Sequence, residues 1–415
     1  MSLNHTPLGN RVHIGFFGRR NAGKSSVVNA VTGQELAVVS EVKGTTTDPV
    51  QKAMELLPLG PVVIIDTPGI DDEGALGELR VKKTRQILNK TDAAVLVLDG
   101  IYEMAEAEQE LIHLFEEKKI PFVLAINKTD LLEEGIGKAQ KDERLKAYWE
   151  NGTCISVSAR TGFHIQELKE KIAGLTLQEE LSKRIVGDLI RPGDFVVLVV
   201  PVDEAAPKGR LILPQQQTIR DILDADAAAI TVKDNELKEL LQQLGKKPSM
   251  VITDSQVFGK VCADVPREIP LTSFSILFAR YKGNLQTVVR GAAGIETLQE
   301  GDKILISEGC THHRQCGDIG SIKLPNWLRE YTKKHLQIEL TSGTEFPEDL
   351  SEFQLVIHCG GCMLNEREMK YRLKSAAEQG IPMTNYGIAI AYMQGILRRS
   401  VELFPDVLAE LPKGV

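Results

Sequence analysis

The chain has 415 residues, a length that predicts two or three domains rather than one. Hydrophobic residues make up 42% of it and charged residues 26%, which is the balance of a folded globular protein. The formal net charge of −8 argues against a nucleic-acid partner or an anionic membrane surface, because phosphate groups favour basic surfaces.

We do not expect a targeting signal at the start of the chain. Residues 1–18 lack the basic segment followed by an apolar one that a secretory signal needs. No apolar run approaches the roughly 20 residues that span a bilayer. We therefore expect a cytoplasmic protein with no membrane partner. Its six cysteines are too few for a disulfide framework in so long a chain, so clustered ones are candidates for holding a metal.

Apolar runs of strand length alternate with helical patterns along the chain, which predicts an α/β fold with mostly parallel sheets. The first block, residues 1–175, is predicted to be one domain with five strands, each followed by a loop and a helical stretch. The five strands are expected at residues 11–18, 61–69, 93–100, 121–130 and 153–159.

A charged connector over residues 177–194 separates this block from two smaller ones, which we place at residues 176–265 and 266–415. No internal repeat is visible in the sequence. The later strands are expected at residues 194–202, 228–232, 249–254, 271–281, 302–310, 336–340 and 353–359. Helices are expected over residues 218–226, over 235–247 with Gly245 as the stop, and over 366–380 with Gly380 as the stop.

The stretch GRRNAGKS, residues 18–25, fits G-x-x-x-x-G-K-[ST] between a predicted strand and a predicted helix. The amide N–H groups of such a loop and the helix N-terminus form a cradle for phosphate. Lys24 is expected to reach the β- and γ-phosphates, and the Ser25 hydroxyl to bind Mg²⁺. The residues expected to line the nucleotide here are Gly18, Asn21, Ala22, Gly23, Lys24, Ser25 and Ser26.

Three further motifs follow in the order and spacing of a GTPase. The stretch DTPG supplies Asp66 for the magnesium shell and Gly69, whose amide can sense the γ-phosphate. The stretch NKTD supplies Asn127, Lys128 and Asp130, and a carboxylate there accepts two N–H bonds that guanine offers and adenine does not. The stretch SAR places the Ala159 amide, between Ser158 and Arg160, to donate to the guanine O6. Together the motifs predict GTP binding.

Residues 11–175 resemble the translation-factor-type GTPases, within them the group that includes the tRNA-modifying GTPases. The stretch GTTTD matches that group's switch I, so Thr46 and Thr47 are candidates for contacting Mg²⁺ and the γ-phosphate. Ile70 stands where many GTPases carry a water-orienting glutamine. Members without that glutamine often use K⁺ beside a P-loop asparagine, which Asn21 matches. The resemblance implies slow, switch-like, potassium-stimulated hydrolysis of GTP to GDP and phosphate.

Two cysteine groups lie near the end of the chain. Cys310 ends one predicted strand and Cys359 ends another, so parallel pairing would bring both to the same sheet edge, where open α/β sheets place ligands. Gly360 and Gly361 allow a tight turn that directs Cys362 toward the same centre. A zinc site with three cysteines and one histidine, or a redox pair of Cys359 and Cys362, would also account for parts of this pattern.

The pattern C-x-H…H-C-x-x-C resembles that of the [FeFe]-hydrogenase maturation GTPases, the HydF family, and residues 210–226 also look like that family. The resemblance implies a [4Fe–4S] cluster on Cys310, Cys359 and Cys362 in residues 266–415, with His312 as a candidate fourth ligand at an exchangeable position. It also implies a homodimer formed through residues 176–265. The implied role is a scaffold that receives a diiron precursor from two radical-SAM maturases and delivers it to the [FeFe]-hydrogenase apoprotein.

The other histidines and cysteines fit this pattern less well. His358 adjoins Cys359 in a strand, and neighbouring strand residues face opposite sides, so packing or a hydrogen bond to sulfur is favoured over iron ligation. Cys154 and Cys262 are expected to be inert, and Cys316 stays open. The alternative function is an RNA-modifying or ribosome-associated GTPase with a structural zinc site, which the acidic composition disfavours.

Overall fold

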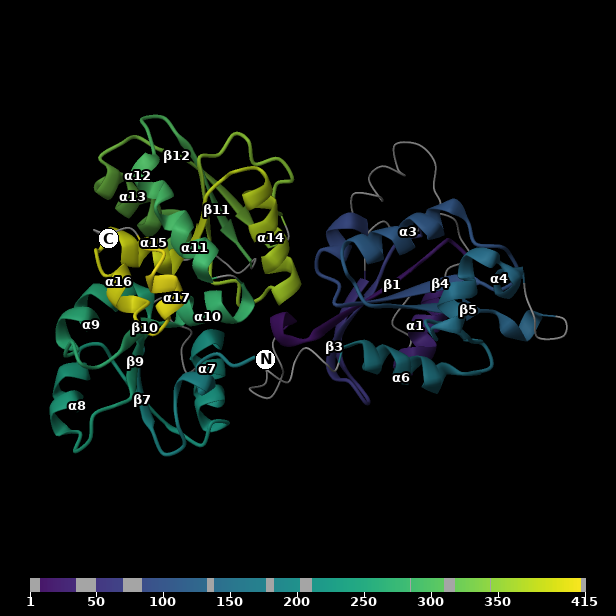
Figure 1. Cartoon of the computed structure of the whole chain (residues 1–415), viewed down its shortest axis with the longest axis horizontal. Coiled ribbons are helices and arrows are strands. Elements are labelled where there is room, and N and C mark those ends of the chain that lie inside the picture. Colours follow the sequence, from purple (N-terminus) through teal and green to yellow (C-terminus); the bar gives the residue numbers. More distant parts are fainter. Residues whose placement is uncertain are drawn as a thin grey trace. The chain divides into compact units, whose positions relative to one another are not determined.

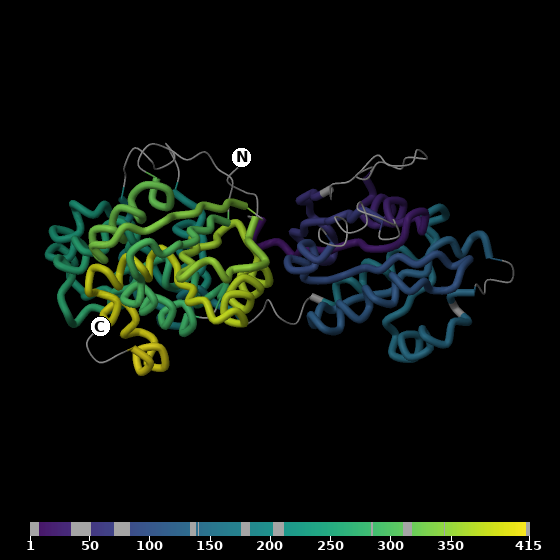
Figure 2. The backbone as a smooth tube through the Cα atoms, turned by 90° about the horizontal axis from the view of Figure 1, so that it is seen from above, coloured from purple at the N-terminus to yellow at the C-terminus, as the bar shows by residue number. Residues whose placement is uncertain are grey.

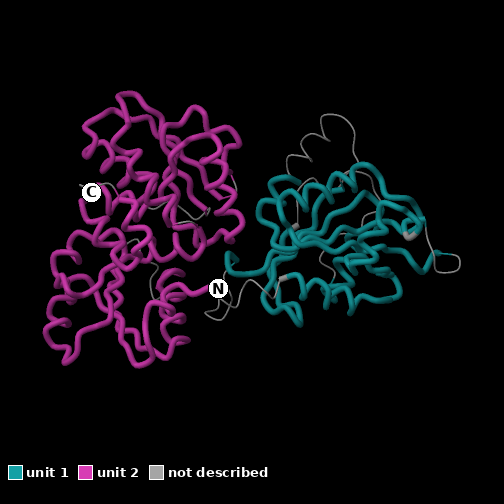
Figure 3. The backbone as a smooth tube through the Cα atoms, in the orientation of Figure 1, with its two compact units in different colours: residues 1–182 teal, residues 183–415 magenta. Residues whose placement is uncertain are grey.

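The computed structural model describes residues 8–34, 50–69, 84–132, 138–176, 183–201, 211–283, 285–309, 318–343 and 345–411. The chain divides into two compact units, Met1–Ser182 and Lys183–Val415 (Figure 3). In the described part of the chain, no helix combines the length and the apolar character that crossing a bilayer requires.

Unit 1 is built on a six-stranded sheet with the order β2-β3-β1-β4-β5-β6. Figure 1 labels β1, β3, β4 and β5 of this sheet. All neighbours in it are parallel except β2, which pairs antiparallel with β3. The strands are β1 Val12–Gly18, β2 Val50–Leu56, β3 Gly60–Asp66, β4 Ala93–Asp99, β5 Phe122–Asn127 and β6 Cys154–Ser156. The helices are α1 Lys24–Thr32, α3 Glu106–Glu117, α4 Lys138–Lys141, α5 Lys146–Glu150 and α6 Ile165–Thr176.

The two faces of this sheet are buried by different helices, so its inner strands β1, β4 and β5 are predominantly apolar. Ile14 and Phe16 of β1 pack with α1 and α6 on one face. Phe17 points to the other face, where it packs with Leu111 and Phe115 of α3. This two-sided burial is the reason that the runs in β1, β4 and β5 could be recognised as strands. The parallel α/β prediction for the unit is confirmed.

Unit 2 contains two four-stranded parallel sheets. The first has the strands β7 Phe195–Val199, β8 Ala228–Val232, β9 Met250–Thr253 and β10 Leu271–Ser273, with helices α7 Leu213–Leu223, α8 Leu237–Gln243, α9 Phe258–Asp264 and α10 Phe274–Lys282. The second has β11 Lys303–Glu308, β12 Gln337–Ser342, β13 Leu355–His358 and β14 Met383–Asn385. The remaining helices are α11 Leu285–Ala292, α12 Gly294–Thr297, α13 Leu324–Thr332, α14 Glu366–Glu378, α15 Tyr386–Met393, α16 Leu397–Ser400 and α17 Pro405–Leu408.

The predicted strand over residues 271–281 is wrong beyond its first three residues. Strand β10 ends at Ser273, whose hydroxyl accepts a hydrogen bond from the Ile276 N–H at 3.3 Å and so caps α10. Phe274, Leu277 and Phe278 are buried, at the helical spacing of i, i+3 and i+4. The cap at Ser273 and this spacing explain why the apolar run after β10 forms the helix α10 and not a longer strand.

The two sheets of unit 2 share one strand order although the sequence shows no repeat. The orders are β10-β9-β7-β8 and β12-β11-β13-β14, so in each sheet the first strand lies between the second and the third. All strands stay parallel, but the chain adds its second strand on one side of the first and its third strand on the other side. The strand order therefore reverses between β7 and β9, and in the second sheet between β11 and β13. Such reversal points leave a crevice outside the carboxyl ends of the strands, where ligands bind.

The C-terminal segment, yellow in Figure 2, folds back over unit 2, with α16 against β10 and α17 against α11. Arg399 of α16 is buried and donates to the carbonyl oxygens of Cys262, Val265 and Pro266, at 2.6 to 2.9 Å. These bonds satisfy carbonyl groups at the end of α9. Arg399 Nη1 also lies 3.3 Å from the Cys262 Sγ, which ties this cysteine to a structural role.

Candidate functional site

The phosphate loop joins β1 to α1. Gly18 ends the strand, and Gly23 has a φ of 83°, a left-handed conformation that favours glycine, directly before α1 begins at Lys24. Lys24 is buried and contacts the Asp66 carboxylate at the end of β3. The Ser25 hydroxyl donates to the other oxygen of Asp66 at 3.0 Å. Lys24, Ser25 and Asp66, three of the residues predicted for phosphate and Mg²⁺, therefore lie together.

Two glycines, Gly23 in the phosphate loop and Gly69 in the DTPG segment next to it, leave no room for a side chain. A Cβ atom on Gly23 would lie 2.3 Å from Asn127 Nδ2, and one on Gly69 would lie 3.0 Å from the backbone nitrogen of Arg20. Asn21 also has a positive φ, 63°, which asparagine tolerates better than most residues. This tight backbone turn before a helix N-terminus fits the triphosphate of a nucleotide.

The residues predicted to recognise the guanine base lie next to the phosphate loop and are bonded to it and to one another. Asn127 Nδ2 donates to the Ala22 carbonyl at 3.0 Å, and the Ala159 N–H donates to Asn127 Oδ1 at 3.1 Å. The Ser158 hydroxyl donates to Asp130 Oδ1 at 2.7 Å. These bonds join the NKTD and SAR segments to the phosphate loop. Arg160 is exposed and lies 3.8 Å from Asp130, while Ser26 lies in the first turn of α1.

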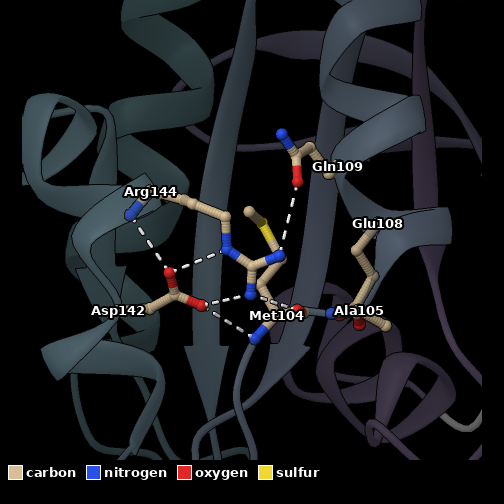
Figure 4. A network of polar contacts seen from close by, with 6 residues as sticks. All are labelled: Met104, Ala105, Glu108, Gln109, Asp142 and Arg144. Atoms are coloured by element: carbon tan, nitrogen blue, oxygen red, sulfur yellow. Dashed lines mark hydrogen bonds and ion pairs between the residues drawn. The ribbon is translucent and has the colours of Figure 1, made fainter.

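A polar network fixes the loop between β4 and α3 (Figure 4). Asp142 Oδ2 accepts from the Met104 N–H at 3.2 Å, and Arg144 Nη2 donates to the Met104 carbonyl. Arg144 also donates to Asp142, and this bond lowers the pKa of that carboxyl. The loop begins after Asp99, whose carboxylate lies 2.6 Å from Lys128 Nζ. The network thus holds the loop that follows the end of β4, where Asp99 contacts Lys128 of the NKTD segment.

Several predicted residues lie outside the described ranges. They are Thr46, Thr47, Ile70, Cys310, His312 and Cys316. Within the described ranges, which omit residues 310–317, no three His, Cys, Asp or Glu side chains gather as metal ligands would.

The C-x-x-C segment follows β13 at the reversal point of the second sheet of unit 2. Strands β11 and β13 are parallel neighbours, with Ser307 opposite His358. Gly309, the residue before Cys310 in the chain, donates its N–H to Cys359 Sγ at 3.0 Å. The strand end that leads into Cys310 is therefore within hydrogen-bond distance of Cys359.

The sulfur of Cys359 is held by backbone amides. Besides the bond from Gly309, the Gly361 N–H approaches Cys359 Sγ at 3.4 Å, and Gly361 has a φ of 62°. Burial raises the pKa of Cys359 to about 11 and also raises that of Cys362. Amide donors to a buried cysteine sulfur suit a thiolate that is bound to a metal, because metal binding removes the proton of the thiol. The donor set therefore fits a thiolate-ligated centre such as an iron–sulfur cluster.

Both ring nitrogens of His358 are engaged by protein groups. Its Nδ1 lies 2.7 Å from the Cys359 carbonyl oxygen, and its Nε2 lies 2.9 Å from Arg372 Nη1. Because Arg372 can only donate, Nε2 accepts and the Nδ1–H donates. Burial, followed by the charge of Arg372, lowers the pKa of His358 to about 3. In this arrangement His358 is a neutral, buried strand residue whose two ring nitrogens are bonded to the Cys359 carbonyl and to Arg372.

Sequence reasoning missed two buried cations at this site, Arg372 of α14 and Lys282 of α10. Arg372 donates to Glu368 Oε1 at 3.0 Å, to the Ser307 hydroxyl at 3.2 Å and to the Gly343 carbonyl at 2.8 Å. A signal was present, because Arg372 occupies the apolar face of α14 that the buried Met369, Leu373 and Ala376 define.

We expect the substitution Arg372→Met to lower the free energy of unfolding of unit 2 by about 3 kcal/mol, because it leaves buried acceptors without their donor. Urea unfolding followed by Trp327 fluorescence, in a Trp149→Phe background, measures this change in unit 2. Lys374→Met is the control, since Lys374 is exposed on the same helix and its ion pair with Glu378 is long, at 3.5 Å. Equal midpoints for both variants would contradict the structural role of Arg372.

Family models match three consecutive parts of the chain. Residues 13–128 match the model described as 50S ribosome-binding GTPase. Residues 185–283 match the Hydrogen maturase F dimerization domain, and residues 286–403 match the Hydrogen maturase F tetramerization domain.

Similar curated proteins align mainly with the first part. GTPase Der of Wolinella succinogenes is 35% identical over 178 residues, 42% of this chain and 37% of that protein. The tRNA modification GTPase MnmE of Acetivibrio thermocellus is 30% identical over 248 residues, 59% of this chain and 50% of that protein. The chain thus spans about a third to a half of these relatives. The crystal structure of Aquifex aeolicus Era overlaps with a TM-score of 0.36 at 19% identity, over 56% of this chain and 98% of that one.

The sheet, the phosphate loop and the GTPase family model define the first unit as a P-loop GTPase domain. Two further α/β sheets follow it in one chain, and the dimerization and tetramerization models that match them imply an oligomer. The chain belongs to the HydF family, the hydrogen maturase F proteins. The family resemblance drawn from the sequence is confirmed.

Proposed function

We propose that the chain is a GTP-binding and GTP-hydrolysing scaffold for [FeFe]-hydrogenase maturation. It holds a [4Fe–4S] cluster with an exchangeable coordination position and delivers a diiron precursor to the apo-hydrogenase. Family membership supports the hydrogenase role, and the phosphate loop with Asp66, Asn127 and Asp130 supports GTP with Mg²⁺ as its nucleotide.

The observation that carries the cluster proposal is the parallel pairing of β11 and β13 with the Gly309 amide on Cys359 Sγ. In the proposal, Cys310, Cys359 and Cys362 are the thiolate ligands and His312 is the candidate fourth ligand. When bound, the cluster supplies an iron atom with one coordination position that cargo can occupy and leave. Gly309 and Gly361 donate to sulfur and so stabilise the thiolate form.

Delivery is tested by isolating the protein from cells with and without the two radical-SAM maturases and mixing each preparation with apo-hydrogenase. Only the protein from cells with the maturases is expected to yield hydrogenase activity, because the cargo is made elsewhere and carried here. Equal activation by both preparations would contradict the carrier role.

We further propose that K⁺ stimulates turnover through Asn21, because no water-orienting glutamine follows DTPG in the sequence. GTP hydrolysis in KCl is expected to exceed that in NaCl of equal ionic strength by about tenfold, or ~1.4 kcal/mol of barrier. Asn21→Gly is a suitable control, since glycine keeps the positive φ of this position and removes the carboxamide. The control should hydrolyse GTP equally in both salts. Equal rates for the unsubstituted protein would contradict the proposal.

A further inference from the structure

A buried lysine holds the cysteine loop from the side of α10. Lys282 is the last residue of α10, and its side chain is almost completely removed from solvent, at 3% exposure. Its ammonium group donates to the carbonyl oxygen of Leu364 at 2.8 Å, of Cys362 at 3.3 Å and of Gly361 at 3.5 Å. These three carbonyls belong to the loop that carries the C-x-x-C pair between β13 and α14.

Burying an ammonium group is costly unless negative charge lies near it. Burial lowers the pKa of Lys282 to about 8, and the charges that act against this decrease are those of Cys362, Glu366 and Cys359. Glu366 is already shared, because Lys183 Nζ lies 2.6 Å from it and Lys370 pairs with it as well. The bond to the Cys362 carbonyl places the ammonium group beside the segment that carries both cysteines, where a thiolate-bound centre would supply negative charge.

There is little space for water around the ammonium group of Lys282. The cavity that Lys282 lines together with His358, Cys359 and Gly360 has a volume of about 20 Å³. That volume holds about one water molecule. A charge in such a site interacts strongly with its neighbours, because the local dielectric constant is low.

We propose that Lys282 is a positioning residue of the metal centre, which holds the C-x-x-C loop through its carbonyls and supplies buried positive charge to the thiolate-bound cluster. The inference rests on the proposed function, since it assigns a role toward the cluster. Three thiolates give the loaded site net negative charge, and reduction by one electron increases it. A nearby fixed cation stabilises the more negative state, so Lys282 raises the reduction potential of the cluster.

The test compares cluster reduction potentials by EPR-monitored titration of the full chain after anaerobic reconstitution. The variants are Lys282→Met, which removes charge and donors, Lys282→Gln, which keeps a donor without charge, and Lys282→Arg, which keeps the charge. We expect the potentials of the Met and Gln variants to lie below that of the unsubstituted protein, and the Arg variant to match it. Lys370→Met is the control, because it removes an exposed cation of α14 that pairs with Glu366; its potential should be unchanged.

The outcomes separate the inference from the proposed function. If the unsubstituted protein binds no cluster, the proposed function fails. If it binds one and the Met and Gln variants titrate at its potential, the role of Lys282 fails. The EPR signal comes only from loaded molecules, so partial loading still gives a potential. If the Met and Gln variants take up no iron, loading of the Arg variant supports the role of charge, and a colourless Arg variant overturns it.

Discussion

Lys24→Ala is expected to reduce GTP turnover by at least about 100-fold, because it removes the buried cation that we propose stabilises charge on the β- and γ-phosphates. Phosphate release under saturating GTP measures the loss. Asp66→Ala should have a similar effect, since Asp66 holds both Lys24 and the Ser25 hydroxyl. Iron content after reconstitution should stay at the level of the unsubstituted protein, because the cysteines lie in the other compact unit.

Lys171→Ala is the matched control for this experiment. Lys171 lies on α6 of the same unit, and its ammonium donates to the Gly152 carbonyl at 2.6 Å on the exposed surface. Turnover should be unaffected by its loss. A Lys24→Ala protein that hydrolyses GTP normally would contradict the nucleotide site, and one that fails to take up iron would show that the two units do not act independently.

Cys359→Ala is expected to lower iron affinity by more than about 100-fold, because hydrogen-bond partners of metal ligands alone are worth about 10- to 100-fold. Loss of the sulfur also leaves the Gly309 and Gly361 amides without their acceptor. Iron and sulfide content, together with the visible absorption of the reconstituted protein, measure this change. Cys362→Ala and Cys310→Ala should behave alike.

Two other cysteines serve as controls for that loss. Cys154→Ala removes a buried residue of β6 whose pKa burial raises to about 12, and Cys262→Ala removes the sulfur next to Arg399. Both variants should keep full iron content. Iron retained by Cys359→Ala, or lost from Cys154→Ala, would contradict the assignment of the ligands.

In the first unit, the sequence predicted the strands whose two faces are both buried. Strands β1, β4 and β5 are continuous apolar runs because helices cover both faces of their sheet. Strand β2 was missed because it is an edge strand with exposed side chains, so no apolar run marks it. Helix α15 was missed for the opposite reason. It is buried on nearly all sides, so its sequence has no polar face and no helical period.

The candidate sites were predicted unevenly for a related reason. The GTPase motifs are local in sequence, so Lys24, Asp66, Asn127 and Asp130 could be named without coordinates. Contacts between segments that are distant in the sequence could not be predicted in this way. The bonds from Lys282 to the loop of Cys362, and the shared strand order of the two sheets in unit 2, depend on tertiary packing that no short pattern records.

The most direct measurement is a crystal structure of the anaerobically reconstituted protein, with anomalous diffraction recorded at the iron absorption edge. We predict an iron–sulfur cluster bonded to the sulfurs of Cys310, Cys359 and Cys362, at the carboxyl ends of β11 and β13. A single zinc ion on these residues, or sulfurs that diverge with no iron between them, would contradict the scaffold and leave only a GTPase.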